Sequence, residues 1–243
     1  RTIAAREERL SRAIGLEPVD RMPCAPLIEC YAARFSGISV HDFFYDKEAA
    51  FDALRKIKEA YPIWDIRRST YYLHYGPCQN AIGLLKSKIP GKDAATEEEM
   101  QFLEEETMER SDYSIVLEQG WEEYLLATYR RMYKADEDAV KSARAEQERI
   151  LELERAEAES MGQVFFYDEH MMFPASYFTH LRSFSEFIRD VYQIPDLLRE
   201  VFYRATEESL TAVLEKAKER RMDRIMIGIP RICGEFFSDK IFE

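Results

Sequence analysis

The chain has 243 residues, of which 46% are hydrophobic and 33% charged, and its 46 acidic and 34 basic residues give a net charge of −12. This composition excludes a disordered chain, because it supplies enough apolar surface for a well-packed core. It also argues against a nucleic-acid-binding protein, which normally carries a basic surface.

Cysteine spacing and hydropathy favour a cytoplasmic protein. The four cysteines lie far apart and form no C-x-x-C pair, so reduced thiols are expected rather than a disulfide framework. No apolar run approaches the roughly 20 residues of a membrane span. The N-terminal stretch RTIAAREERLSRAIG predicts an amphipathic helix without a secretory apolar core. We therefore expect a cytoplasmic location and no membrane partner.

The first part of the chain is predicted to alternate between helix and strand. A helix is expected over 2–15, and the proline-bounded apolar run MPCAPLI predicts a buried strand over 22–28. Apolar residues at helical spacing in FDALRKIKEA predict a helix over 47–60. The stretch PIWDIR predicts a second strand near 62–67.

The remaining sequence continues the alternation with longer helices. Residues 96–160 consist mainly of strong helix formers. A third strand is predicted over Val164–Tyr167, helices over 184–192 and 195–221, and a fourth strand within DRIMIGIPRICG. Buried strands separated by long helical segments predict an α/β fold with a parallel sheet and helices outside it.

Residues 1–243 are predicted to form a single domain that is part of a larger fold. The sequence stops at FFSDKIFE, which resembles the opening turn of another helix. Four strand–helix units leave a parallel sheet with open edges. We therefore expect a longer polypeptide, of which this chain is the N-terminal part and the C-terminal half is absent.

Polar or ionisable side chains follow each predicted strand. Loops after the carboxyl ends of parallel strands converge, so active sites form there. The candidate residues at these ends are Glu29, Tyr31, Arg34, His74, Asp168, His170 and Arg231. Tyr72 and Tyr167 lie in aromatic stretches that could line a pocket for a flat ligand or pack in the core. Each residue alone could equally be a cap or an ion-pair partner.

Glu29 is the candidate whose position most needs a reason. A carboxylate at the mouth of a buried strand is costly unless it has a partner or a task. We expect it to pair with Arg231, or to accept a hydrogen bond that orients a histidine or the substrate. Without such a partner its carboxyl group would tend to protonate.

Short motifs exclude several classes of site. His74 and His170 are two of four histidines and suit proton transfer or metal binding, although an isolated histidine is commonly structural. The chain has no H-E-x-x-H, C-x-x-C or H-x-C, so no metal ligand is identified. It also has no G-x-G-x-x-G, G-x-x-x-x-G-K-[ST] or G-x-S-x-G, which leaves dinucleotide, P-loop and nucleophile-elbow sites without support.

Three stretches resemble the uroporphyrinogen decarboxylase superfamily. RLSRAIGLEPVDRMPCAPLIECYAARFSGISVHDFF resembles its opening helix, G-x-P-x-D-R-x-P turn and first strand. CQNAIGLLKSKIPG is similar to the extended piece after its second strand, and DRIMIGIPRICGEFFSDKIFE to its fourth strand and the segment that follows. The resemblance implies a TIM (β/α)8 barrel of which these residues cover strands one to four.

The superfamily's decarboxylases use residues that this chain lacks. Their sequences share an arginine-rich M-R-Q-A-G-R loop after strand one and an aspartate, within F-S-D, after strand two. This chain has LIECYAARF and DIRRSTYYLHYG at these places, with Arg34 as the only arginine of the first loop and Glu29 beside it. Because a carboxylate repels an octacarboxylate substrate, we do not expect uroporphyrinogen to be turned over.

The resemblance is closer to the branch of corrinoid-linked methyltransferases and O-demethylases. It implies an enzyme that moves a methyl group between a small methylated substrate and a corrinoid protein. In that case the pocket would be lined by Glu29, Tyr31, His74, Asp168, His170 and Arg231, with Asp168 or His170 transferring a proton. Several members use zinc bound by His-x-Cys and a later Cys, but this chain offers no ligands for zinc or for a corrinoid.

Two alternatives to methyl transfer stay open. One is a decarboxylase that acts on a porphyrinogen or on another carboxylated substrate. The other is a non-catalytic scaffold, a subunit that keeps the fold without the chemistry. Each of these functions is compatible with a homodimer.

Overall fold

Two-stranded parallel pairs and long helices make up the fold of this chain, which is mixed α/β and mostly helical. The structure is a computed structural model that describes residues 2–69, 76, 78, 86–234, 236–238 and 241. Contacts divide the chain into two compact units. The first comprises Arg1–Ile82, Ser87–Gln101 and Lys141–Phe166, and the second Gly83–Lys86, Phe102–Val140 and Tyr167–Glu243.

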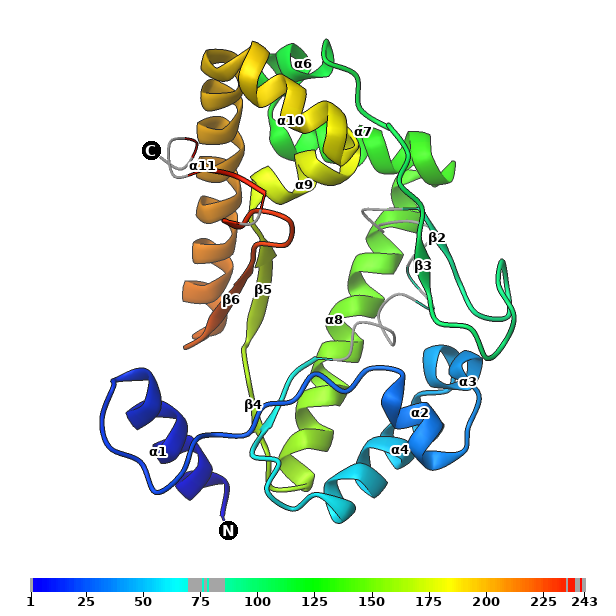
Figure 1. Cartoon of the computed structure of the whole chain (residues 1–243), viewed down its shortest axis with the longest axis vertical. Helices are drawn as coiled ribbons and strands as arrows, with labels where there is room; N and C mark the ends of the chain where they lie inside the picture. Colours follow the sequence, from blue (N-terminus) through cyan, green and yellow to red (C-terminus); the bar gives the residue numbers. More distant parts are fainter. Residues whose placement is uncertain are drawn as a thin grey trace. The chain divides into compact units, whose positions relative to one another are not determined.

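Four helices of the first unit bury a shared apolar cluster. They are α2 (Tyr31–Ser36), α3 (Val40–Tyr45), α4 (Lys47–Ala60) and the part of α8 (Glu137–Ser160) from residue 141 on, whereas α1 (Ile3–Ile14) packs its Leu10 against Ile66 and Val164. Phe43, Phe44, Leu54 and Ile57 lie in the cluster, each at most 2% exposed. Figure 1 shows α2, α3 and α4 side by side, and α2 and α4 are in contact.

Helix α4 has the bounds that its sequence predicts, because the signals that set them are local. The Asp46 side chain accepts a hydrogen bond from the Ala49 N–H at 3.0 Å and so caps the first turn. The apolar residues Leu54 and Ile57 then recur at helical spacing and face the cluster. The predicted helix over 47–60 is therefore confirmed.

The strands of the first unit are short. β1 (Ile66–Arg67) pairs in parallel with β4 (Val164–Phe165), with Ile66 opposite Val164 and Arg67 opposite Phe165. β2 (Ser87–Lys88) and β3 (Gln101–Phe102) form a separate two-stranded sheet. The parallel pairing of β1 with β4 fits the predicted parallel arrangement of strands two and three.

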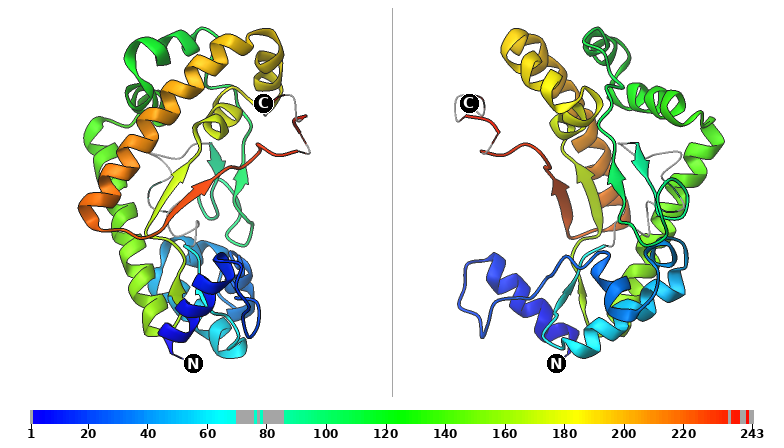
Figure 2. Two further views of the ribbon diagram at one scale, coloured as in Figure 1. Left: turned by 90° about the vertical axis from the view of Figure 1, so that its left-hand side faces the viewer. Right: turned by 45° about the vertical axis from the view of Figure 1, so that its right-hand side comes forward.

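The second unit is built around a second parallel pair. β5 (Glu169–Met172) pairs with β6 (Ile225–Gly228), and α11 (Pro195–Arg220) packs along β5, as both views of Figure 2 show. The other helices are α6 (Asp112–Gln119), α7 (Trp121–Tyr133), α9 (Pro174–Leu181) and α10 (Phe184–Gln193). The predicted helices over 184–192 and 195–221 are confirmed to within one residue at each end.

The predicted first strand is wrong. Residues 22–28 form an irregular segment, with Met22 78% and Leu27 55% exposed. Pro23 and Pro26 have no N–H to donate to a strand ladder, which favours an irregular course. Cys24 anchors the segment, because its carbonyl accepts hydrogen bonds from the N–H groups of residues 65 and 66, each at 3.0 Å.

Two further boundaries differ from the sequence prediction. Residues 96–111 are not helical, although the helices from Asp112 onwards are as expected. The third predicted strand ends at Phe165, and a new strand begins at Glu169. Asp168 therefore lies in the connection that follows β4, whereas His170 lies within β5 and not after a strand's carboxyl end. The reason is that β5 pairs with β6 and buries Met171, so the strand continues through polar residues.

Asp65 is the charged centre of the first unit. This fully buried carboxylate accepts hydrogen bonds from Arg6 at 3.2 Å, from Arg9 at 3.2 Å and from both terminal nitrogens of Arg21 at 2.6 and 2.8 Å. The Cys24 N–H donates a further bond at 3.1 Å. Burial alone would raise the pKa of Asp65, but these hydrogen bonds and the arginine charges outweigh it and lower the pKa.

Asp190 has the equivalent place in the second unit. It is fully buried and accepts hydrogen bonds from Arg110 Nε at 2.8 Å, from the Tyr113 hydroxyl at 3.0 Å and from Arg182 Nε at 2.8 Å. These bonds tie α10 to α6 and to the segments beside it. Each unit is thus organised around one buried aspartate with several cationic partners.

Within the described part of the chain, the helices are too short or too polar for any of them to cross a lipid bilayer.

Replacing Asp65 by asparagine should destabilise the protein by about 3–5 kcal/mol, because it leaves several buried arginine charges without a counter-ion. Urea unfolding at neutral pH measures the loss. The control is Asp52→Asn, which removes a 62%-exposed carboxylate that pairs with Arg55 and should cost about 1 kcal/mol or less. Equal losses in the two variants would show that the Asp65 cluster does not organise the unit.

Candidate functional site

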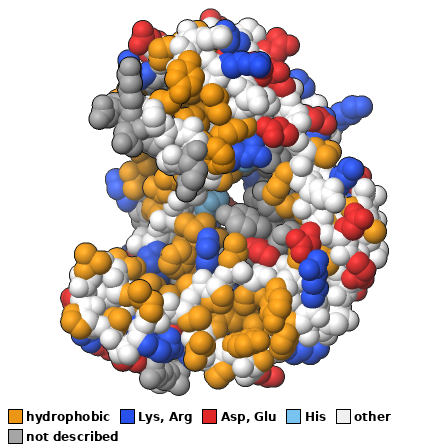
Figure 3. All heavy atoms as spheres, viewed as in Figure 1, with side chains coloured by type: hydrophobic (Ala, Val, Ile, Leu, Met, Phe, Trp, Pro, Cys, Tyr) orange, Lys and Arg blue, Asp and Glu red, His pale blue; other side chains and the backbone are white. Residues whose placement is uncertain are grey.

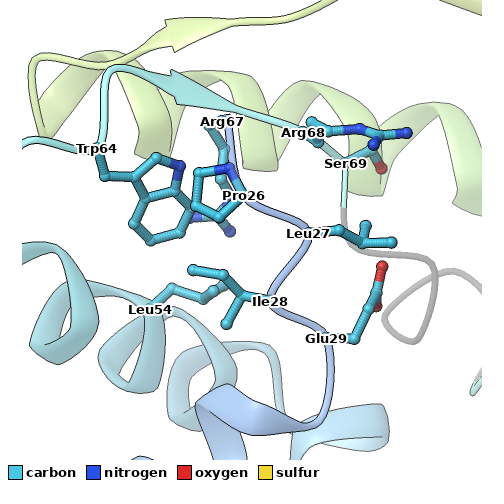
Figure 4. A pocket seen from close by; sticks show the side chains of 9 residues that line it. All are labelled: Pro26, Leu27, Ile28, Glu29, Leu54, Trp64, Arg67, Arg68 and Ser69. Carbon is cyan, nitrogen blue, oxygen red and sulfur yellow. The ribbon is translucent and has the colours of Figure 1, made fainter. Parts of the chain in front are cut away.

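A hollow in the first unit lies between the irregular segment, α4 and the end of β1. It is lined by Pro26, Leu27, Ile28, Glu29, Leu54, Trp64, Arg67, Arg68 and Ser69 (Figure 4). Most of its wall is apolar, and one carboxyl group, two guanidinium groups and one hydroxyl supply its polar character. The hollow is small, with a volume of about 10 Å³, which is room for about one water molecule.

The backbone at Glu29 is strained. Its φ angle is +45°, in the left-handed region that a residue with a Cβ adopts at a cost of about 1–2 kcal/mol. The turn is held by two hydrogen bonds, from the Tyr31 N–H to the Ile28 carbonyl and from the Ala32 N–H to the Glu29 carbonyl, each at 3.0 Å. The turn places Glu29 directly before α2 and directs its side chain to the side of the hollow where Leu27 and Ser69 lie (Figure 4).

The Glu29 carboxyl group is protonated at neutral pH. Both of its oxygens are buried, and neither has a hydrogen-bond partner among the described residues. Burial raises its pKa most, the charge of Glu154 raises it further, and the charges of Arg68 and Arg67 oppose them, giving a pKa of about 8. Glu29 is therefore a neutral acid that can donate a proton.

Arg67 is the second unusual group of the hollow. It is 1% exposed, and its Nη2 lies 3.9 Å from Glu154 Oε1, which is beyond hydrogen-bond distance. None of its three guanidinium nitrogens has a hydrogen-bond partner among the described residues. Burial lowers the pKa of Arg67, against the charges of Glu154, Glu157 and Glu29, which raise it. Arginine nevertheless remains charged in proteins.

Glu154 and Arg68 complete the charged surroundings of the hollow. Glu154 is fully buried on α8 and accepts a hydrogen bond from the Ser69 hydroxyl at 2.6 Å. The Arg68 guanidinium lies 5.9 Å from the centre of the Phe166 ring, within the range of a cation–π contact. The site therefore combines two acids, Glu29 and Glu154, with two arginines, Arg67 and Arg68.

The predicted residues Tyr31 and Arg34 lie on the surface of α2. Arg34 Nη2 forms an ion pair with Glu99 at 2.9 Å, and both side chains are more than half exposed. Tyr31 is 51% exposed, and its ring lies 5.8 Å from that of Phe35, which lies 6.1 Å from that of Tyr61. Figure 3 shows hydrophobic side chains gathered on this face, over α2 and the C-terminal end of α4.

Asp168, His170 and Tyr167 belong to the second unit. Asp168 accepts hydrogen bonds from the N–H groups of Asp223 and Arg224 at 2.9 and 3.0 Å, so it holds the turn before β6. The half-buried His170 lies within β5, and its ring centre is 6.1 Å from that of the buried Tyr167. These contacts give Asp168 a structural task in the second unit.

Arg231 also belongs to the second unit and follows β6, as predicted. Its φ angle is +64°, its Nη1 lies 3.6 Å from Glu104 Oε1, and its guanidinium lies 5.9 Å from the centre of the Phe184 ring. Glu104 is thus the acid that the structure places beside Arg231.

The predicted cavity shared by Glu29, His74, Asp168, His170 and Arg231 stays a prediction. Glu29 lies in the first unit, whereas Asp168, His170 and Arg231 lie in the second. Tyr72 and His74 lie outside the described residues. The structure brings Glu29 together with Arg67, Arg68 and Glu154 instead.

Sequence reasoning missed Arg67 and Glu154 as parts of the site. Arg67 and Arg68 stand out in the sequence as one of its few basic pairs, directly after an apolar run. Glu154 gives no such signal, because it lies in a helix rich in both charges, a pattern typical of a solvated face.

The structure supplies no metal centre within its described residues, since no three or more His, Cys, Asp or Glu side chains form a group that could hold an ion.

Comparison with known proteins finds no matching family model, no matching curated protein and no matching solved structure.

Glu29→Gln should remove a pH dependence of stability. Between the ordinary pKa of 4.5 and the raised pKa of about 8, the unfolded chain ionises Glu29 while the folded protein keeps it neutral. Wild-type stability therefore falls as pH rises through this range, by at most about 1.4 kcal/mol per pH unit. Glu29→Gln should lack this loss, whereas the exposed control Glu99→Gln should keep it.

Urea unfolding of the three proteins across this pH range measures the effect. A constant difference in stability between wild type and Glu29→Gln would contradict the assignment of a neutral, buried Glu29.

Proposed function

We propose that this chain belongs to an enzyme that moves a methyl group from a small methylated substrate to a corrinoid protein, with Glu29 as its proton donor. We further propose that its parallel strands are part of a TIM (β/α)8 barrel. The observation that carries the proposal is the neutral, buried Glu29 carboxyl group, held in a strained turn at the edge of an apolar hollow. The sequence resemblance to the corrinoid-linked methyltransferases supports the same function.

Demethylation of an ether, thioether or amine needs a proton. When the bond between the methyl carbon and the heteroatom breaks, the heteroatom keeps the bonding electron pair. It becomes a good leaving group only if it takes up a proton, which a neutral carboxyl group can supply. A reduced corrinoid on the partner protein would supply the electron pair that forms the new bond to the methyl carbon.

The residues around Glu29 suit a cycle of proton donation and recovery. Burial and the charge of Glu154 keep the proton on Glu29 before the reaction. Once the proton has left, the charges of Arg67 and Arg68 stabilise the carboxylate that remains. The pKa of about 8 allows the carboxylate to take a proton from water again near neutral pH.

Zinc does not fit the described residues, because they hold no group of ligands for it. The apolar side chains of Leu27, Ile28 and Trp64 beside Glu29 would keep bulk water from the transferring proton.

Glu29→Gln should lower the rate of methyl transfer by about 10²–10⁴-fold, the usual contribution of a general acid. The assay gives the protein reduced cobalamin and a panel of methyl ethers, methyl thioethers and methylamines, and follows the demethylated product by mass spectrometry. The control Glu99→Gln changes an exposed glutamate and should keep the wild-type rate.

Two results would contradict the proposed function. One is a lack of demethylated product from every member of the panel. The other is an unchanged rate in Glu29→Gln. Release of carbon dioxide from a carboxylated substrate would favour a decarboxylase instead.

A further inference from the structure

The buried Glu29 carboxyl group lies beside a space that fits one water molecule. Both of its oxygens are buried and have no hydrogen-bond partner among the described residues. Buried polar groups in folded proteins are nearly always satisfied, either by other protein groups or by ordered water. The hollow that Glu29 lines has a volume of about 10 Å³, close to the least that holds one water.

A water in an otherwise apolar hollow also needs a second polar partner. The Ser69 hydroxyl lines the same side of the hollow as Glu29 (Figure 4). Its single hydrogen is donated to Glu154 Oε2 at 2.6 Å. A hydroxyl oxygen carries two lone pairs, so the Ser69 oxygen can accept a hydrogen bond while it donates this one. Glu29 is a donor to the same space, since its carboxyl group carries a hydrogen at pH 7.

We propose that the hollow binds one water molecule, which accepts a hydrogen bond from the Glu29 carboxyl group and donates one to the Ser69 hydroxyl oxygen. The donors then follow one another in a single direction, from Glu29 through the water and Ser69 to Glu154. The last group, a carboxylate, accepts hydrogen bonds and has none to donate. Hydrogen bonds in such a chain polarise and strengthen one another.

The water explains how a neutral acid is kept in a buried position with its hydrogen-bonding capacity used. It also connects Glu29 to solvent, because the hollow is lined by Leu27, which is 55% exposed. After Glu29 has given up its proton, the water would pass one proton to the carboxylate and take one from solvent, and so end uncharged. This use of the water rests on the proposed function, whereas the water site itself does not.

A crystal structure of the wild-type protein at about pH 7, at a resolution that shows ordered water, tests the inference. Density for one water oxygen should lie in the hollow, about 2.5–3.2 Å from a Glu29 carboxyl oxygen and from Ser69 Oγ. A hollow without such density, or a water that contacts only one of the two side chains, would overturn the inference.

Two variants should each lose the water, because each removes one of its partners. Ser69→Ala removes the acceptor, and Glu29→Met replaces the donor by an unbranched apolar side chain of similar length. The control is Ser36→Ala, which removes a hydroxyl that donates to the Ala53 carbonyl at 3.3 Å in the same unit and should leave the water in place. Since the two variants change different residues, either one that folds suffices. A water that stays at the same position in Ser69→Ala or in Glu29→Met would contradict the inference.

The outcome is separable from that of the proposed function. The water in its place without any methyl transfer would leave the water site standing and remove only its use in returning a proton. Methyl transfer by a protein whose hollow holds no water would leave Glu29 as the proton donor and remove the water site.

Discussion

The hydrogen bonds from Arg6, Arg9 and Arg21 to the buried Asp65 are the interaction on which the first unit depends. They join α1 and the segment after it to the start of β1. The Cys24 N–H donates to the same carboxylate, so the irregular segment is fixed in place although it forms no strand. Because this segment leads directly into the Glu29 turn, the Asp65 cluster also positions the hollow. A buried charge with this many partners is costly to break and therefore holds a definite geometry.

Asp65 and Glu29 are both acids in the first unit with buried carboxylate oxygens, yet their protonation states differ. Asp65 has three arginine partners and a backbone N–H, and its pKa is lowered. Glu29 has no hydrogen-bond partner among the described residues and faces the charge of Glu154, so its pKa is raised. Proteins separate structural acids from reactive ones by placing similar carboxyl groups in environments that shift their pKa values in opposite directions. The strained backbone at Glu29 fits the second role, since strain is retained where the surroundings impose it.

The sequence predicts those parts of this structure that depend on local signals. The helix over 47–60 follows from its Asp46 cap and its apolar spacing, and Glu29 stands out as an acid after an apolar run. The prediction of a strand over 22–28 failed because it relied on apolar composition. Pro23 and Pro26 have no N–H groups for the hydrogen bonds of a regular strand. Glu154 could not be predicted as part of the site, because only the tertiary fold turns that position of α8 away from solvent. The placement of His170 within β5 likewise depends on its pairing with β6.

The central claim is that Glu29 is a neutral acid in the folded protein at pH 7. Its most direct test is the carbon-13 NMR titration of the folded protein with glutamate labelled at the side-chain carboxyl carbon. Glu29→Gln identifies the Glu29 resonance by its absence. The account predicts that this resonance titrates with a midpoint near pH 8, whereas an ordinary glutamate titrates near 4.5. A Glu29 midpoint near 4.5 would contradict the account.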